Sequence, residues 1–247
     1  CGVVPQLRGR RGEEVFRAAL FSADLRALFD FFRMILYNNR KVRVRTHRLV
    51  AGRRRRAGLR RGGTRGISMR IDEILAQKRT LSFEVFPPKK GMEERDKLFS
   101  VIDELRELSP DFISVTYGAG GSNSKNSVEI ADYLQNRAQI TALAHITGGP
   151  SSPEDVTAVA SALRDRGVEN VLCLRGDRPV GYEADYCRWF PHATDLAAYL
   201  APYGFSLGAA CYPEGHPECE SLYADLVNMK KKEEAGARFF ITQLFYD

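Results

Sequence analysis

Glu84 lies in a short apolar and aromatic run, LSFEVFPPKK at residues 81–90, that ends at two prolines. In an extended strand its side chain shares a face with Ser82 and Phe86, and the opposite face is apolar throughout. Proline cannot donate to a β ladder, so the strand is expected to stop at Pro87. A carboxyl group desolvated by aromatic rings holds a proton and can act as a general acid, whereas a glutamate on an exposed edge strand is merely solvated. The run by itself leaves both interpretations open.

A polar side chain lies at the end of each strand-like run of the chain. There are six such runs, including the one that holds Glu84, and they begin about 30 residues apart. Their sequences are LSFEVF at 81, DFISVTYG at 111, ITALAHIT at 140, ENVLCLRGD at 169, FSLGAACYPE at 205 and RFFITQLFYD at 238. The polar residues at their ends are Glu84, Thr116, His145, Arg175 with Asp177, Tyr212 and Gln243. Taken alone, His145 would more often be a satisfied core histidine, so its position at a strand end is what makes it a candidate.

Helical patterns separate these runs, and IDEILAQK before the first run is typical of a short lead-in helix. Residues 92–108 carry apolar side chains at helical spacing. Ser152 is a candidate N-cap, with Pro153 at the first helical position, Asp155 in the first turn and Gly167 as a stop. In the helix predicted before the last strand, the residues expected to face inward are Leu222, Leu226 and Met229.

The alternation of strand and helix predicts parallel βαβ units, arranged as an open doubly wound sheet or as a (β/α)8 barrel. Polar residues at every strand end favour the barrel, because there all strand ends surround one central site. No G-x-G-x-x-G follows the first run, and GAGGS at 118–122 has the wrong spacing for a dinucleotide sheet. We predict an α/β fold, a (β/α)8 TIM barrel with about six βα units present. The chain is thus expected to be a fragment truncated at its C-terminus, with Glu84 facing the barrel interior.

Residues 1–68 differ sharply in charge from the rest, because they hold 18 of the 37 basic residues and 4 of the 31 acidic ones. Clustered arginine could bind nucleic acid, mark an organelle transit peptide, or reflect translated upstream sequence before a start at Met69. We interpret residues 1–68 as a basic Arg-rich head, non-native upstream translation or a disordered extension. Residues 69–247 are interpreted as the partial barrel.

The five cysteines are odd in number and have no C-x-x-C spacing. This argues against a disulfide framework and a Cys-rich zinc site, and it favours a reducing compartment. No run approaches the roughly 18 uncharged residues that a membrane helix needs. Charges interrupt the apolar stretch at residues 15–37, so a secretory signal is not expected. We expect a cytoplasmic protein without membrane contact and without a metal site.

Several motifs occur in order and at suitable spacing after Met69: FEVFPPK, SVTYGAGGS, AHITG, LRGD, YPEGHPE, DLVNMKKKEEAGA and ITQLFYD. Together they resemble the methylenetetrahydrofolate reductases, and the resemblance covers about residues 69–247 and nothing before it. It implies a flavoprotein with a TIM-barrel fold, in which NADH or NADPH reduces FAD. The reduced flavin then passes a hydride to 5,10-methylenetetrahydrofolate and gives 5-methyltetrahydrofolate.

The resemblance implies catalytic and substrate-binding roles for Glu84, Asp177 and Gln243. Glu84 would supply the proton that opens the methylene bridge, desolvated by the neighbouring phenylalanines and a flavin ring. Asp177 would bond the amino-pyrimidine edge of the pterin and tune the flavin. Gln243 would offer a donor and an acceptor to folate or nicotinamide. From the residues alone, Asp177 could instead cap a helix or pair with Arg175, and Gln243 could be a polar interior residue.

The positions that match the family's FAD contacts are Thr116, His145, Arg175, Gly176, Asp177, Ala193, Tyr212, His216, Asp225, Asn228, Lys231 and Lys232. The two lysines could bind the pyrophosphate. Taken alone, KKKEE at 230–234 is more often a solvated helix face, and His216 would be a turn residue. The pair His192–Ala193 stands where the family pattern has Tyr–Ala, and SNSKN at 122–126 also departs from it.

Two other functions stay open at this stage. The barrel could be a reductase subunit that receives electrons from a partner protein instead of NAD(P)H. The chain could also be non-catalytic, or a nucleic-acid binder led by its Arg-rich head. We expect methylenetetrahydrofolate as the small-molecule partner, no nucleic-acid partner, and a homo-oligomer when the chain is complete.

Overall fold

A computed structural model of the chain describes residues 42–47, 69–88, 92–117, 124–177 and 186–243. The chain divides into two compact units, Cys1–Val44 and Arg45–Asp247, and the second carries every element from α3 to β7. Within the predicted head, the strand β1 (Val42–His47) is the described part. The rest of the head and the GAGGS segment at 118–122 lie outside the described residues, so the interpretation of the head stays a prediction.

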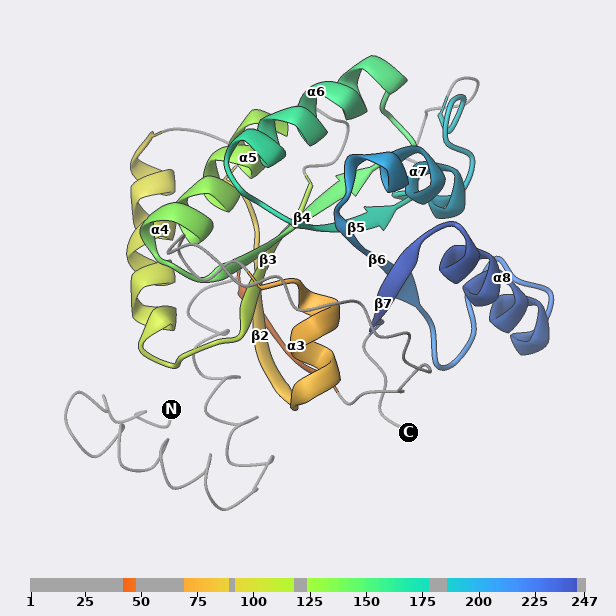
Figure 1. Cartoon of the computed structure of the whole chain (residues 1–247), viewed down its shortest axis with the longest axis horizontal. Helices are drawn as coiled ribbons and strands as arrows, with labels where there is room; N and C mark the ends of the chain where they lie inside the picture. The colour runs from red at the N-terminus through yellow and green to blue at the C-terminus, as the bar shows by residue number, and fades with distance from the viewer. Residues whose placement is uncertain (1–41, 48–68, 89–91, 118–123, 178–185, 244–247) are drawn as a thin grey trace, which may run out of the picture. The chain divides into compact units, whose positions relative to one another are not determined.

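Six parallel strands of the second unit form a curled half-barrel (Figure 1). Each strand pairs in parallel with the next one along the chain, from β2 to β7. They are β2 (Thr80–Val85), β3 (Phe112–Val115), β4 (Thr141–Thr147), β5 (Asn170–Leu174), β6 (Ser206–Cys211) and β7 (Ala237–Thr242). The sequential order arises because each crossover connection returns the chain to the position beside the strand that it left. The predicted α/β class and partial (β/α)8 barrel are therefore confirmed.

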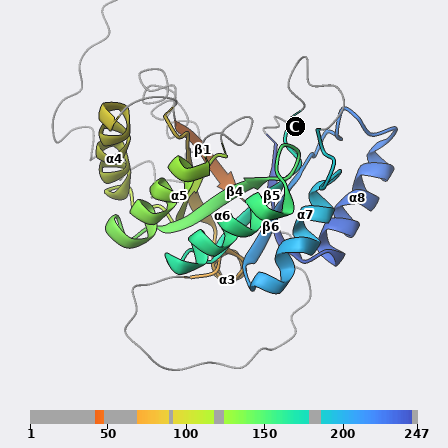
Figure 2. The same ribbon diagram turned by 90° about the horizontal axis from the view of Figure 1, so that it is seen from above.

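Helices α4 to α8 follow one another around the outer side of the strands (Figure 1), and the view from above shows the same succession (Figure 2). The helices are α3 (Ile71–Gln77), α4 (Met92–Arg106), α5 (Ser124–Asp132), α6 (Pro153–Asp165), α7 (Ala193–Leu200) and α8 (Leu222–Glu234). A π-helical turn, Tyr133–Arg137, continues α5, and a 3-10 turn, Ala201–Tyr203, continues α7. The outer helices thus leave the carboxyl ends of the strands to the connecting loops.

A buried apolar cluster joins α3 to the strands. Its members are Ile71, Phe112, Leu143, Leu172, Phe239 and Ile241, none more than 5% exposed. The backbone N–H of Ile71 donates to Asn170 Oδ1 at 2.8 Å, which ties the start of α3 to the start of β5. On β2, Phe83 and Val85 are 1% and 0% exposed. Burial of this order stabilises the fold by about 1.5–3 kcal/mol for each large apolar side chain.

The N-cap and the stop that the sequence predicts for α6 are both confirmed. Ser152 is its N-cap, and its Oγ accepts from the backbone N–H of Asp155 at 3.2 Å. In return, Asp155 Oδ2 accepts from the backbone N–H of Ser152 at 3.1 Å, which completes a capping box. Gly167 follows the helix with a φ of 71°, the left-handed conformation in which glycine is favoured.

The predicted orientation of α8 is wrong for Leu222 and Leu226, whereas Met229 is half-buried. Leu222 and Leu226 are each 53% exposed, and the buried residue of this helix is Asp225. The face of α8 toward β6 is polar. Asp225 Oδ2 accepts from the backbone N–H of His216 at 3.1 Å, and Lys232 Nζ donates to the carbonyl of Ala210 at 2.8 Å. Apolar periodicity weighs only hydrophobic side chains, so it could not identify a buried face made of charged groups.

Candidate active site

Three polar side chains lie together on the inner face of β2, β3 and β4. Glu84, Ser114 and His145 are 3%, 3% and 6% exposed. Glu84 is in register with Ser114 on the neighbouring strand, and their side-chain oxygens Oε2 and Oγ are 3.5 Å apart. His145 Nε2 lies 3.9 Å from Glu84 Oε2. The predicted alternative of an exposed edge-strand glutamate therefore does not hold, and Glu84 is a buried carboxyl group with polar neighbours.

A tight turn follows β5 and brings the ends of β4 and β5 together. Gly176 has a φ of 86°, and a Cβ atom there would overlap the side chain of Thr147 and lie 2.8 Å from Tyr186 Oη. The backbone N–H groups of Gly148 and Gly149 donate to the carbonyls of Leu174 and Arg175 at 2.9 and 2.8 Å. Glycine at 176 is thus required by both its backbone conformation and the close approach of neighbouring side chains.

Arg175, at the end of β5, forms a two-pronged ion pair with Glu218 of the loop that follows β6. Nη1 donates to Oε2 at 2.6 Å and Nη2 donates to Oε1 at 2.9 Å. The carboxylate raises the pKa of the Arg175 guanidinium. Because a fork of this kind uses two of the five N–H donors of the side chain, Arg175 keeps further donors for a ligand.

The loop after β6 and the first turns of α8 hold a cluster of polar groups. The rings of Tyr212 and His216 meet edge to face with their centroids 4.5 Å apart. Asn228 Nδ2 donates to Cys219 Sγ at 3.5 Å, and Cys219 Sγ lies 3.7 Å from Asp225 Oδ1. Four predicted cofactor residues, Tyr212, His216, Asp225 and Asn228, therefore belong to one contiguous network.

The two predicted lysines differ in their surroundings. Lys232 is partly buried, and burial lowers the pKa of its ammonium group while the charge of Asp225 opposes the shift. Lys231 is exposed and donates to Asn228 Oδ1 at 3.4 Å. Lys232 is thus the lysine held beside the end of β6, whereas Lys231 lies on a solvated face.

Three of the remaining predicted residues, Thr116, Asp177 and Gln243, lie just after strands, and the fourth, Ala193, begins a helix. Asp177 is exposed, and its carboxylate adds to burial in raising the pKa of the Tyr212 hydroxyl. Gln243 is exposed just after β7, and its backbone N–H donates to the carbonyl of Cys211 at 2.9 Å. Thr116 donates its backbone N–H to the carbonyl of Val85 at 3.1 Å. Ala193 is the first residue of α7.

Three functional candidates were missed by the sequence reasoning: Ser114, Glu218 and Cys219. Ser114 lies two residues before Thr116 on the same strand face, so strand alternation could have identified it. Glu218 and Cys219 lie in an irregular Gly/Pro loop, where neither the helical nor the strand periodicity of apolar residues applies. Their contacts join residues far apart in the chain, which a local pattern does not show.

Two structural properties concern metals and membranes. In the described parts of the chain, no three His, Cys, Asp or Glu side chains are grouped so that they could hold a metal ion. Among the same residues, no helix has the length and apolar character needed to cross a membrane. Among the described residues, no disulfide joins Cys173, Cys187, Cys211 or Cys219.

The chain is similar to known proteins over most of its second unit. Residues 70–247 match the family described as methylenetetrahydrofolate reductase. The 5,10-methylenetetrahydrofolate reductase of Escherichia coli K12 is 36% identical over 168 residues, which are 68% of this chain and 55% of that protein. The probable methylenetetrahydrofolate reductase (NADH) of Oryza sativa subsp. japonica is 37% identical over 193 residues, 72% of this chain and 32% of that protein.

Likeness to solved structures is weaker. An uncharacterized protein from Clostridium thermocellum, described as binding two copies of 5-methyl-5,6,7,8-tetrahydrofolic acid, has a TM-score of 0.44 and 17% identity and covers 67% of this chain and 54% of its own. The chain spans about half the length of its bacterial relatives and about a third of the plant ones. The family match over residues 70–247 nonetheless covers most of the sequence, and the chain belongs to the methylenetetrahydrofolate reductase family.

Proposed function

We propose that this chain takes part in the reduction of 5,10-methylenetetrahydrofolate to 5-methyltetrahydrofolate, with FAD as its flavin and NADH or NADPH as the reductant in a ping-pong cycle. The observation that carries the proposal is the buried carboxyl group of Glu84, 3.9 Å from His145 and 3.5 Å from Ser114 at the inner face of the strands. In this family, a buried acid at a strand end is suited to a reaction that begins by protonating its substrate.

Several residues of the site suit a flavin dinucleotide. FAD, when bound, supplies the hydride chemistry that no side chain can perform. The ammonium group of Lys232 and the guanidinium group of Arg175 offer positive charge for its pyrophosphate. Tyr212 and His216 present ring edges and polar atoms beside them. The absence of a side chain at Gly176 lets the turn after β5 pack closely against Thr147 and Tyr186.

Glu84 has the central role in the proposed folate step. Its carboxyl group would supply the proton that opens the methylene bridge. Ser114 and His145 would orient it, since both present a polar atom to Oε2. Asp177, exposed at the mouth beyond β5, would bind the amino-pyrimidine edge of the substrate, and Gln243 would approach from the end of β7.

The test is a visible absorption spectrum of the purified chain with FAD added. Binding should be followed by loss of the oxidised-flavin band when NADH or NADPH is added without oxygen, and methylenetetrahydrofolate should restore the band. NADH is tried first because the rice relative is named for it. A chain that takes up no FAD, or whose flavin responds to neither nicotinamide, would contradict the proposal. Bleaching by a reduced carrier protein alone would favour a subunit fed by a partner.

A further inference from the structure

Glu218 joins the loop between β6 and α8, residues 212–221, to the end of β5. We propose that Glu218 is a positioning residue: its carboxylate fixes Arg175 and its backbone fixes His216, so that both face the proposed cofactor in a set geometry. The inference rests on the proposed function for the identity of the ligand. The clamp itself stands on contacts within the chain.

The side chain of Glu218 holds the guanidinium plane of Arg175 in place. The fork joins Nη1 to Oε2 at 2.6 Å and Nη2 to Oε1 at 2.9 Å. A third bond, from Arg175 Nε to the carbonyl of Gly176 at 3.3 Å, orients the same plane from the other side. Two parallel charge-assisted bonds define an orientation that a single contact does not. The remaining N–H groups of Arg175 are therefore directed by Glu218.

The backbone of Glu218 acts on the neighbouring histidine. Its N–H donates to His216 Nδ1 at 3.1 Å, so the proton of a neutral His216 ring belongs on Nε2. The ring is also held edge-on to Tyr212, and the backbone N–H of His216 donates to Asp225 Oδ2 at 3.1 Å. His216 can thus offer an Nε2–H donor in a defined direction. Moving the Glu218 backbone would release that ring.

The role of the pair is local. The side chains of Arg175 and Glu218 are 29% and 63% exposed, and an ion pair this open contributes little to the stability of a whole fold. It joins two segments 43 residues apart in the chain, each carrying predicted cofactor contacts. Removing it is therefore expected to loosen the loop and misplace Arg175 while the half-barrel stays folded.

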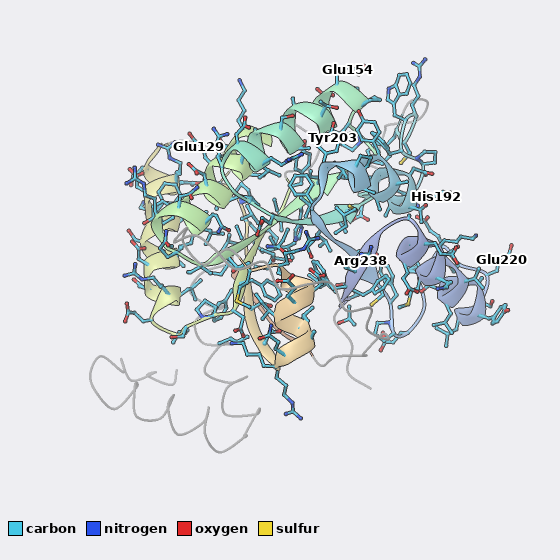
Figure 3. All side chains as sticks on the ribbon, viewed as in Figure 1. Glu129, Glu154, His192, Tyr203, Glu220 and Arg238 are labelled. Carbon is cyan, nitrogen blue, oxygen red and sulfur yellow. The ribbon has the colours of Figure 1, made fainter. Side chains whose placement is uncertain are left out.

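The matched variants are Glu218→Gln and Glu220→Gln, which lie in the same loop and remove the same charge. Glu220 is exposed and extends outward beside α8 (Figure 3). In flavin-free protein, amide hydrogen exchange of residues 212–221 should be about two- to fivefold faster in Glu218→Gln, the range expected for losing an open ion pair. Glu220→Gln should match the parent chain, and the thermal midpoints of both variants should be unchanged.

FAD titration then tests positioning. Glu218→Gln should weaken FAD binding by about fivefold, and the loss should disappear in an Arg175→Gln background, since the carboxylate acts through that arginine. Unchanged hydrogen exchange overturns the clamp. Faster exchange with equal or tighter FAD binding, or a loss that persists without Arg175, overturns the positioning role. If the parent chain binds no FAD, the proposed function fails, and the exchange rates alone decide for or against the clamp.

Discussion

At the scale of single residues, the position of Glu84 is explained by its neighbours on adjoining strands. Its register partner is Ser114, and His145 of β4 approaches the same oxygen at 3.9 Å. A carboxyl group that is 3% exposed needs polar partners, because burying an unpaired polar group is costly. The polar neighbours therefore account for how a glutamate is accommodated in this face of the sheet.

Replacing Glu84 by Gln should separate the two proposed half-reactions. Glutamine keeps the size of the side chain but cannot donate an acidic proton. Flavin reduction by NAD(P)H should persist, while folate-dependent reoxidation should fall by about 10²- to 10⁴-fold. Anaerobic stopped-flow absorbance measures both steps, and Glu104→Gln on the exposed side of α4 is the control. Survival of both steps would remove Glu84 as the acid, and loss of both would make its role structural.

At the scale of elements, the turn after β5 is the most constrained connection near the site. Its glycine, Gly176, combines a left-handed backbone with side chains of Thr147 and Tyr186 in the space that a Cβ atom would occupy. Gly204 has a similar φ of 79°, but a Cβ there would meet nothing within 4 Å. The two positions therefore share a left-handed φ that would strain any other residue, and they differ in crowding, so a pair of variants can distinguish the two effects.

Replacement of each glycine by alanine should give unequal losses of stability. Gly204→Ala should cost about 1 kcal/mol for the left-handed conformation alone. Gly176→Ala should cost that amount and about 1–3 kcal/mol more for overpacking against Thr147. Urea unfolding followed by circular dichroism gives both free energies. Equal losses at the two positions would show that crowding at Gly176 relaxes without cost.

The polar inner face of α8 leads to a prediction about its lysines. Lys232→Gln should weaken FAD binding by about tenfold or more, the value of one charge-assisted contact. Lys230→Gln is the control, because that side chain is 61% exposed and pairs with Glu233. Isothermal titration of FAD measures both. Equal effects of the two replacements would contradict the assignment of Lys232.

The same contact should depend on pH in a defined direction. Burial lowers the pKa of Lys232, so its positive charge is present below that lowered pKa and is lost at a lower pH than in an exposed lysine. The difference in FAD affinity between the parent chain and Lys232→Gln should therefore shrink as the pH rises toward the ordinary lysine range. A difference that stays constant to pH 10 would contradict a role for this charge.

At the scale of the whole molecule, the Arg-rich head and the half-barrel differ in charge and in their relation to the candidate site. Residues 1–68 carry 18 of the 37 basic residues, but the site lies entirely in later elements. The chain spans 55% of the Escherichia coli relative, so the homo-oligomer and the cytoplasmic location expected from the sequence stay predictions. The function proposed above requires that the head be dispensable for flavin binding.

Deleting residues 1–68 should leave FAD uptake unchanged. A second truncation, of residues 1–41, keeps β1 and serves as the control for that strand. The ratio of absorbance at 260 and 280 nm reports nucleic acid retained through purification. Nucleic acid that is present in the parent chain and lost on deletion, together with no flavin binding in either form, would favour a nucleic-acid binder over a reductase.

The sequence by itself determined what depends on near neighbours in the chain. Strand and helix alternation, the Ser152–Asp155 capping box and the stop at Gly167 follow from backbone geometry and hydrogen bonds within a few residues. The barrel order of the strands was predicted from the polar residues at every strand end, which favoured a barrel over an open doubly wound sheet. The candidate site could be located from the sequence because the carboxyl ends of the strands converge in a barrel.

The tertiary structure alone decided which of those residues meet. The Glu84–Ser114 and Arg175–Glu218 contacts join positions 30 and 43 residues apart, and no local pattern encodes them. It also decided which face of α8 is buried, because Asp225 is buried and Leu226 is exposed. A charged group is buried when a distant partner compensates for its lost hydration, and that partner exists only once the chain has folded.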